Sequence, residues 1–238
     1  MSHPHPPAWL PAGLQPIRPK LLSCQVIPHA DPALRAQFGG RPEWTSLGLV
    51  TVDQDDCTYA ALDHATKFAE VEVVYAKSFY AGAAHASGPL SGEVLGVLAG
   101  PDPDEIYEGL AALREFLSTD TCFYQVPGPG SQPALFPQVI AETGLYLSAA
   151  AGIPAGQPLA YLIAPPVEAM IALDAALKAA DVRLCQFFGP PTETNYAGAY
   201  LTGTLYACEA AAAAFAEAVM AVAAQPLSAA RRSSRQRG

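Results

Sequence analysis

The stretch LDHATKFAEVEV, residues 62–73, returns later in the chain as LDAALKAADVRL, residues 173–184. The shared residues are Leu62, Asp63, Ala65, Lys67, Ala69 and Val71, which match Leu173, Asp174, Ala176, Lys178, Ala180 and Val182 at one constant separation. In each copy the leucine and the alanines three and seven residues later share one helix face, and a β-type run follows. This internal repeat predicts two copies of one α/β unit.

The match extends beyond these segments. Gly92 meets Gly203 at the same separation, and the tripeptide at 80–82, Tyr-Ala-Gly, recurs at 196–198 five positions out of register. Between the copies lies the Pro/Gly/Ser cluster PGPGSQP. We therefore expect a linker at 127–133 between domains at 20–126 and 134–226, a flexible N-terminal extension at 1–19, and a basic disordered tail at 227–238.

Periodicity predicts similar elements in the two copies. In the first we expect strands at 21–27, 47–52, 71–76 and 93–99, with helices at 58–70 and 104–117. In the second we expect strands at 145–149, 159–163, 182–187 and 200–206, with helices at 167–180 and 209–222. The predicted fold is an α/β sandwich in which small alanines bring the helices close to a sheet.

Composition narrows the function classes. A hydrophobic content of 51% with 15% charged residues indicates apolar surface buried in cores or between subunits. The net charge of -9 argues against non-specific nucleic-acid binding, although the tail carries four arginines. No signal peptide is apparent, and the apolar run at 210–224 is interrupted by Glu217 and predicts a buried helix rather than a membrane span. The five cysteines form no CxxC pair.

Three longer stretches carry a resemblance: SLGLVTVDQDDCTYAALDHATKFAEVEVVYAKSFYAGAAH, AYLIAPPVEAMIALDAALKAADV and PPTETNYAGAYLTG. They resemble the tandem-domain shell proteins of bacterial microcompartments, of the ethanolamine-utilisation type, over about residues 15–226. The resemblance implies two circularly permuted shell domains, each a small antiparallel sheet with packed helices. It also implies a cytoplasmic location in the shell, no catalysis and no cofactor, and a homotrimeric, pseudo-hexameric tile with a gated central pore and small pores.

The resemblance assigns roles to several residues. Lys67 and Lys178 fall at the lysine that contacts the neighbouring tile, although ordinary solvated lysines remain the alternative. The loops at 77–91 and 188–199 correspond to those that close or open the central pore, or are plain hairpin loops. The candidate gate residues are Phe79, Tyr80, His85, Asn195 and Tyr196.

Asp55, Glu93 and Phe123 match positions that line a small pore and hold ethanolamine in the resembled family. A primary ammonium suits carboxylate acceptors and an aromatic face. Asp56 is expected to cap the following helix instead. Other shell proteins and small metabolites are the implied partners, with cobalamin a further candidate ligand; neither nucleic acid nor a membrane is expected.

Two other function classes stay open at this point. One is a soluble amine-binding or regulatory α/β protein built around Asp55 and Glu93. The other is an enzyme using His64, His85 and scattered carboxylates, but no metal-ligand spacing, P-loop or nucleophile elbow supports it.

Overall fold

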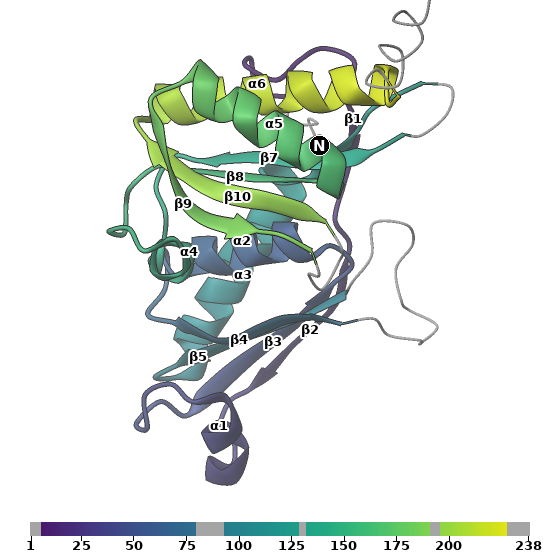
Figure 1. The fold of residues 1–238 in the computed structure, drawn as a ribbon. Coiled ribbons are helices and arrows are strands. Elements are labelled where there is room, and N and C mark those ends of the chain that lie inside the picture. Colours follow the sequence, from purple (N-terminus) through teal and green to yellow (C-terminus); the bar gives the residue numbers. More distant parts are fainter. Residues whose placement is uncertain (1–5, 80–92, 129–131, 191–195, 228–238) are drawn as a thin grey trace, which may run out of the picture.

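The computed structural model describes residues 6–79, 93–128, 132–190 and 196–227, and has two antiparallel sheets with helices between and beside them (Figure 1). The first unit contains β2 (Leu21–Ile27), α1 (Pro32–Phe38), β3 (Ser46–Val52), α2 (Asp55–Ala65), β4 (Glu72–Phe79), β5 (Glu93–Gly100) and α3 (Pro103–Thr119). Its strands lie in the order β2-β3-β5-β4.

The second unit repeats this arrangement. It contains β7 (Ala134–Ile140), α4 (Leu145–Ala151), β8 (Leu159–Ala164), α5 (Pro166–Ala179), β9 (Val182–Phe188), β10 (Ala197–Gly203) and α6 (Leu205–Ala224), with strand order β7-β8-β10-β9. Two short strands, β6 (Phe123–Gln125) and β1 (Gln15–Ile17), extend this sheet beyond β7. The predicted α/β fold with two similar antiparallel units is confirmed.

One predicted element is wrong: residues 145–149, expected as a strand, lie in helix α4. The strand of the second copy is β7 instead, and it contains Pro137 opposite Leu162. No strand was predicted here, and a proline inside a run is itself a signal against a sheet strand. The helix forms because the carboxylate of Asp63, from the other unit, accepts the backbone N–H groups of Gly144 and Leu147 at its start, at 2.7 Å each.

Gly92, which the sequence match pairs with Gly203, lies outside the described residues. Gly203 is the last residue of β10 and is followed by α6. The glycine at the corresponding strand end of the first unit is Gly100. Tyr206, predicted in a strand, accordingly lies in the first turn of α6.

The expected linker at 127–133 connects β6 and β7, which pair with each other, Tyr124 opposite Leu135. The end of the predicted first domain therefore contributes a strand to the second sheet. The division of the chain into domain ranges stays a prediction.

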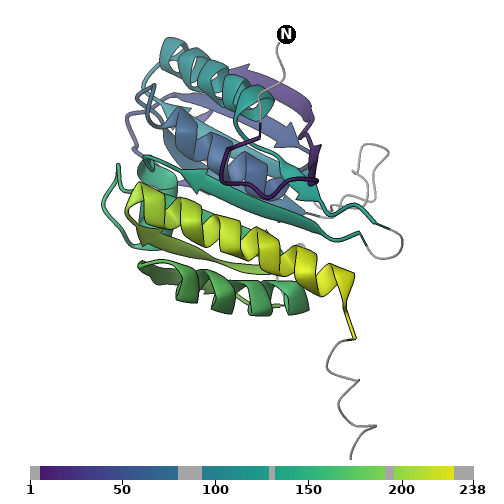
Figure 2. The ribbon, with the colours of Figure 1, turned by 90° about the horizontal axis from the view of Figure 1, so that it is seen from above.

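The elements form four stacked layers: the first sheet, the layer of α2 and α3, the second sheet, and the layer of α5 and α6 (Figure 1). Seen from above, α5 (green) and α6 (yellow) lie side by side (Figure 2). Alternate residues of the second sheet face opposite ways. Phe136 and Tyr161 belong to the core shared with α2, while Leu135 and Leu162 belong to the core under α5 and α6. Both faces of the second sheet are thus covered.

Helix α6 is long and apolar enough, by length and composition, to cross a membrane. A core helix of a soluble protein passes the same test, and Cys208, Ala212, Phe215 and Val219 of α6 are fully buried in the core of the second unit.

Candidate functional site

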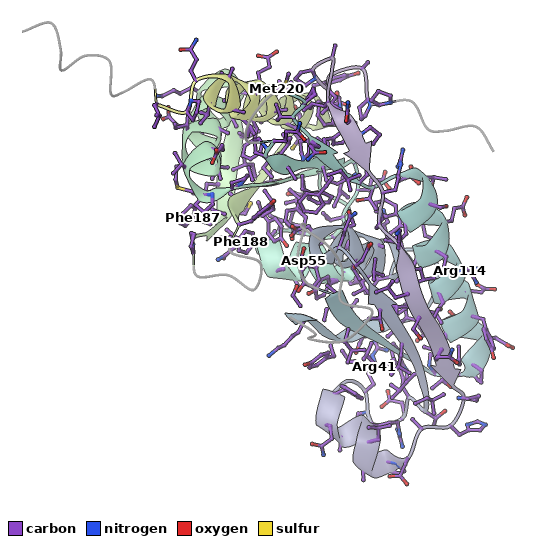
Figure 3. The ribbon with its side chains drawn as sticks, turned by 90° about the vertical axis from the view of Figure 1, so that its right-hand side faces the viewer. Arg41, Asp55, Arg114, Phe187, Phe188 and Met220 are labelled. Atoms are coloured by element: carbon purple, nitrogen blue, oxygen red, sulfur yellow. The ribbon has the colours of Figure 1, made fainter. Side chains whose placement is uncertain are left out.

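A cavity of about 340 Å³ lies where the two units meet. Its walls come from α2, β4, α4 and the strands of the second sheet, and Figure 3 shows Asp55 near the middle of the molecule, between the two units. The lining residues are Asp55, Asp56, Tyr59, Ala76, Tyr146, Ala150, Tyr161, Ile163, Gln186, Phe188, Tyr196 and Tyr200. The site therefore combines two neighbouring carboxylates with an aromatic wall.

Asp55, the first of the predicted small-pore residues, begins α2 and is 4% exposed. Its carboxylate accepts hydrogen bonds from the Ser78 hydroxyl at 2.9 Å and from the backbone N–H of Asp56 at 2.9 Å. The Ser78 hydroxyl in turn lies 3.1 Å from the Tyr59 hydroxyl. These partners hold Asp55 in one orientation at the cavity wall.

Asp56 does not cap α2 as predicted. Its carboxylate accepts a hydrogen bond from the Tyr161 hydroxyl of the second sheet, so it joins the two units. The N-cap position belongs to Gln54, which makes no side-chain capping bond. Sequence reasoning missed this role because Tyr161 is 105 positions away and carries no local signal.

The aromatic wall is built from side chains in edge contact. The ring of Tyr200 lies 4.6 Å from that of Tyr161 and 4.8 Å from that of Phe188, with interplanar angles of 82° in both pairs. Burial, above all, raises the pKa of Tyr59, Tyr161 and Tyr200, so their hydroxyls stay protonated and can donate hydrogen bonds. Buried carboxylates beside aromatic faces form a setting suited to an organic ammonium ion.

Phe123, the second predicted small-pore residue, is buried at 1% exposure. Its ring packs 5.0 Å from Phe136 and 6.3 Å from Tyr196, and Tyr196 lines the cavity. Phe123 therefore lies directly behind the cavity wall. Glu93, the third, is the first residue of β5, paired with Phe79 of β4.

Of the candidate gate residues, Phe79 ends β4 and Tyr196 lies just before β10. Tyr80, His85 and Asn195 lie outside the described residues. The cavity contacts both predicted loops at their bases, through Ala76 of β4 and through Tyr196.

The two candidate edge lysines lie at the ends of corresponding helices but in different surroundings. Lys67 follows α2, and its Nζ donates to the backbone carbonyl of Glu142 at 3.0 Å. Lys178 lies in the last turn of α5 and pairs with Asp174 at 2.6 Å.

His64 packs against aromatic side chains, with its ring centroid 4.6 Å from each of the Phe68 and Phe116 rings. Within the described part of the chain, no group of three histidine, cysteine or acidic residues is arranged to hold a metal ion.

Comparison with known proteins identifies the family, although no family model matches the chain. The microcompartment shell protein EutL of Clostridium perfringens is 54% identical over 211 residues, covering 89% of this chain and 97% of the relative. EutL of Salmonella typhimurium is 46% identical, covering 90% and 98%. The crystal structure of EutL from Leptotrichia buccalis superposes with a TM-score of 0.84 at 51% identity, covering 90% of this chain and 98% of that one.

A trimeric microcompartment shell protein, PduB, shares the fold at 20% identity, with a TM-score of 0.72 over 85% of this chain and 88% of that one. The long matches at high identity, together with the shared fold, show that this chain belongs to the EutL family of bacterial microcompartment shell proteins.

Proposed function

We propose that this chain forms a homotrimeric, pseudo-hexameric tile of an ethanolamine-utilisation shell, with an amine-binding small pore in each chain and a gated central pore. As a shell protein of this family it is a structural component rather than an enzyme. The observation that carries the trimer is a contrast between the two copies of one helix.

Inside the chain, one face of α2 contacts the second unit. Asp56 accepts from Tyr161, the ring of Tyr59 lies 6.4 Å from that of Tyr146, and Asp63 and Thr66 accept backbone N–H groups at the start of α4. Nine of the eleven residues of α2 are buried. The first unit is thus joined head to tail to the second.

The same face of α5 lies at the surface. The residues that correspond to Asp56, Tyr59 and Thr66 are all apolar: Val167, Met170 and Leu177. They are 65%, 40% and 39% exposed, and the nearby Ile171 is 50% exposed. These four exposed apolar side chains on one helix support a contact with another chain.

The surface that would meet this face is the outer side of the first sheet. Leu49 in the segment LGLV occupies the place of Tyr161 in LAYL, and it points away from α2 and α3. Leu49 and Leu95 on this side are half-buried. If α5 of one chain packs on the first sheet of the next as α2 packs on the second sheet, a head-to-tail contact repeats and three chains close a six-unit ring.

The cavity supports the small-pore part of the proposal. Asp55 and Asp56 supply carboxylate oxygens for an ammonium group, and the tyrosines supply ring faces and a hydroxyl-rich wall. Ethanolamine, with one ammonium and one hydroxyl, fits this chemistry. Glu93 and Phe123 are proposed to complete the site.

The central gate is proposed to use the two loops carrying Phe79, Tyr80, His85, Asn195 and Tyr196, and the tile edges to use Lys67 and Lys178. Other shell proteins are the proposed lateral partners. Cobalamin remains a candidate ligand on the basis of family resemblance alone.

The mass of the purified protein in solution tests the trimer. We expect the mass of three chains for the wild type, and dissociation when Val167→Asp and Ile171→Asp are combined, because charges would replace an apolar contact. Tyr107→Asp is the matched control, since Tyr107 is 56% exposed on α3 and should leave the trimer intact. A wild-type monomer would refute the tile.

Ethanolamine titration calorimetry tests the small pore. Asp55→Asn should abolish or strongly weaken binding while the trimer mass is unchanged, because the neutral amide removes the charge that attracts the ammonium. Unaltered binding would remove Asp55 from the site. A protein that binds the amine but never forms trimers would instead be the soluble sensor considered above.

A further inference from the structure

The two kinds of tile edge, one from each unit, differ in ways that the repeat alone does not suggest. Lys67 and Lys178 correspond, but the next residue is Phe68 in the first copy and Ala179 in the second. Phe68 is 60% exposed although its ring packs against His64. The first edge therefore presents a large aromatic side chain where the second presents a methyl group.

The surroundings of Lys67 extend this apolar surface. Glu142, whose carbonyl accepts from Lys67, lies three residues before Leu145, which is 54% exposed and whose N–H donates to Thr66 at 2.9 Å. Phe68 directly follows Lys67 in the chain and Leu145 is bonded to Thr66, which directly precedes it, so both exposed apolar residues lie near Lys67.

Lys67 also lines a groove of about 540 Å³ that includes Trp9 and Arg18 of the N-terminal segment and three carboxylates from distant parts of the chain. These carboxylates belong to Asp120, Glu142 and Glu209. Among the described residues none of the three forms an ion pair, and together they outnumber the two cations of the groove, Lys67 and Arg18, so the lining carries a net negative charge that favours a cation from outside the chain.

The second edge offers a complementary shape and charge. The side chain of Lys178 there is 73% exposed. Its ion pair with Asp174 is an exposed i,i+4 contact, and such contacts contribute little to stability. Next to it the small Ala179 is also exposed. A lysine beside a small residue fits an edge that carries an aromatic side chain and a carboxylate-lined groove.

Geometry favours the same pairing. In a flat layer of threefold tiles that all point the same way, each edge faces the opposite edge of its neighbour. Opposite edges of a pseudo-hexamer made of three two-unit chains belong to different units. Like edges therefore never meet in such a layer.

We infer that tiles associate through unlike edges: the first-unit edge around Phe68, Leu145 and the groove receives the end of α5, with Lys178 and Ala179, from a second copy of this chain. This inference rests on the proposed trimer. It adds Phe68, Leu145 and the N-terminal segment to the lateral contact, and it is the pairing that a layer of uniformly oriented tiles requires.

Two matched variants test it, one with Lys67→Glu and Phe68→Glu, the other with Lys178→Glu and Ala179→Glu. All four positions are exposed in the single chain. Light scattering at low concentration first establishes that each variant is a trimer. Light scattering and negative-stain imaging at rising concentration then follow lateral association.

Unlike pairing predicts that an equimolar mixture of the two variants associates at a lower protein concentration than either variant alone, because the intact second edge of one meets the intact first edge of the other. We expect each variant alone to need at least about tenfold more protein than the mixture, from loss of one buried aromatic contact and added repulsion. If either variant alone associates at the same concentration as the mixture, or if the mixture fails to associate, the inference is wrong. A wild type that is not a trimer would instead refute the proposed function.

Discussion

Helices α2 and α5 carry the same motif and show how position in the stack changes what a residue does. Asp63 of α2 is 1% exposed and holds the start of α4, whereas Asp174 of α5 is at the surface and pairs with Lys178. His64 is packed between two rings, while the corresponding Ala175 has no such role. The same sequence pattern thus forms the contact between the two units in the first copy and an exposed helix face in the second.

The largest loss of stability should follow the loss of the hydrogen bonds between Asp63 and the second unit. Asp63→Ala leaves the N–H groups of Gly144 and Leu147 buried without an acceptor, so we expect a loss of about 2–4 kcal/mol in the free energy of unfolding. Denaturant unfolding at fixed protein concentration measures it.

Asp174→Ala is the matched comparison. Its exposed ion pair contributes little, so the unfolding free energy of the single chain should change by less than about 0.5 kcal/mol. A loss as large as that of Asp63→Ala would show that the two helices are not as different as the burial indicates. A change confined to the trimer mass would instead assign Asp174 to the contact between chains.

A smaller effect is expected at the second link between the units. Tyr161→Phe removes the hydroxyl that donates to the buried Asp56 and should lower the unfolding free energy by about 1–3 kcal/mol. Tyr107→Phe, which alters an exposed tyrosine on α3, should change it by less than about 0.5 kcal/mol. Equal values for the two variants would mean that the Tyr161 bond does not stabilise the contact between the two units.

The packed histidine predicts a pH dependence. Burial, and secondarily the charge of Lys67, lowers the pKa of His64 below its ordinary value near 6.5. The unfolded chain then binds this proton more readily, so the folded state loses stability as the pH falls below about 6.5. In His64→Phe that part of the acid destabilisation should be absent, as measured by unfolding at pH 7.5 and 5.5. Parallel pH profiles for the variant and the wild type would contradict the prediction.

The smallest effect on stability belongs to the two corresponding lysines. Lys67→Ala and Lys178→Ala should each change the unfolding free energy by less than about 1 kcal/mol, because both side chains are exposed. Their combination should nevertheless reduce sheet formation at unchanged trimer mass. Unchanged sheets, seen by negative-stain imaging, would contradict the edge assignment.

The sequence by itself determined the repeat and, through it, most of the fold. The spacing of Leu62, Ala65 and Ala69, matched by Leu173, Ala176 and Ala180, is a local property of an amphipathic helix, and the β-type runs around it are local as well. Asp55 could also be named from the sequence, because the long resemblance includes it. Local patterns and resemblance therefore predicted the α/β class and most of the repeated helices and strands, while the domain ranges stay a prediction.

The tertiary structure decided everything that depends on contacts between distant segments. The start of α4 became helical because Asp63, more than eighty positions away, accepts its N–H groups, and β7 formed despite Pro137 because β8 and β6 flank it. Asp56 accepts a hydrogen bond from Tyr161 of the other unit, and Phe123 lies behind the cavity wall. Such contacts leave no periodic trace along the chain, because burial and hydrogen bonding are satisfied in space rather than in sequence order.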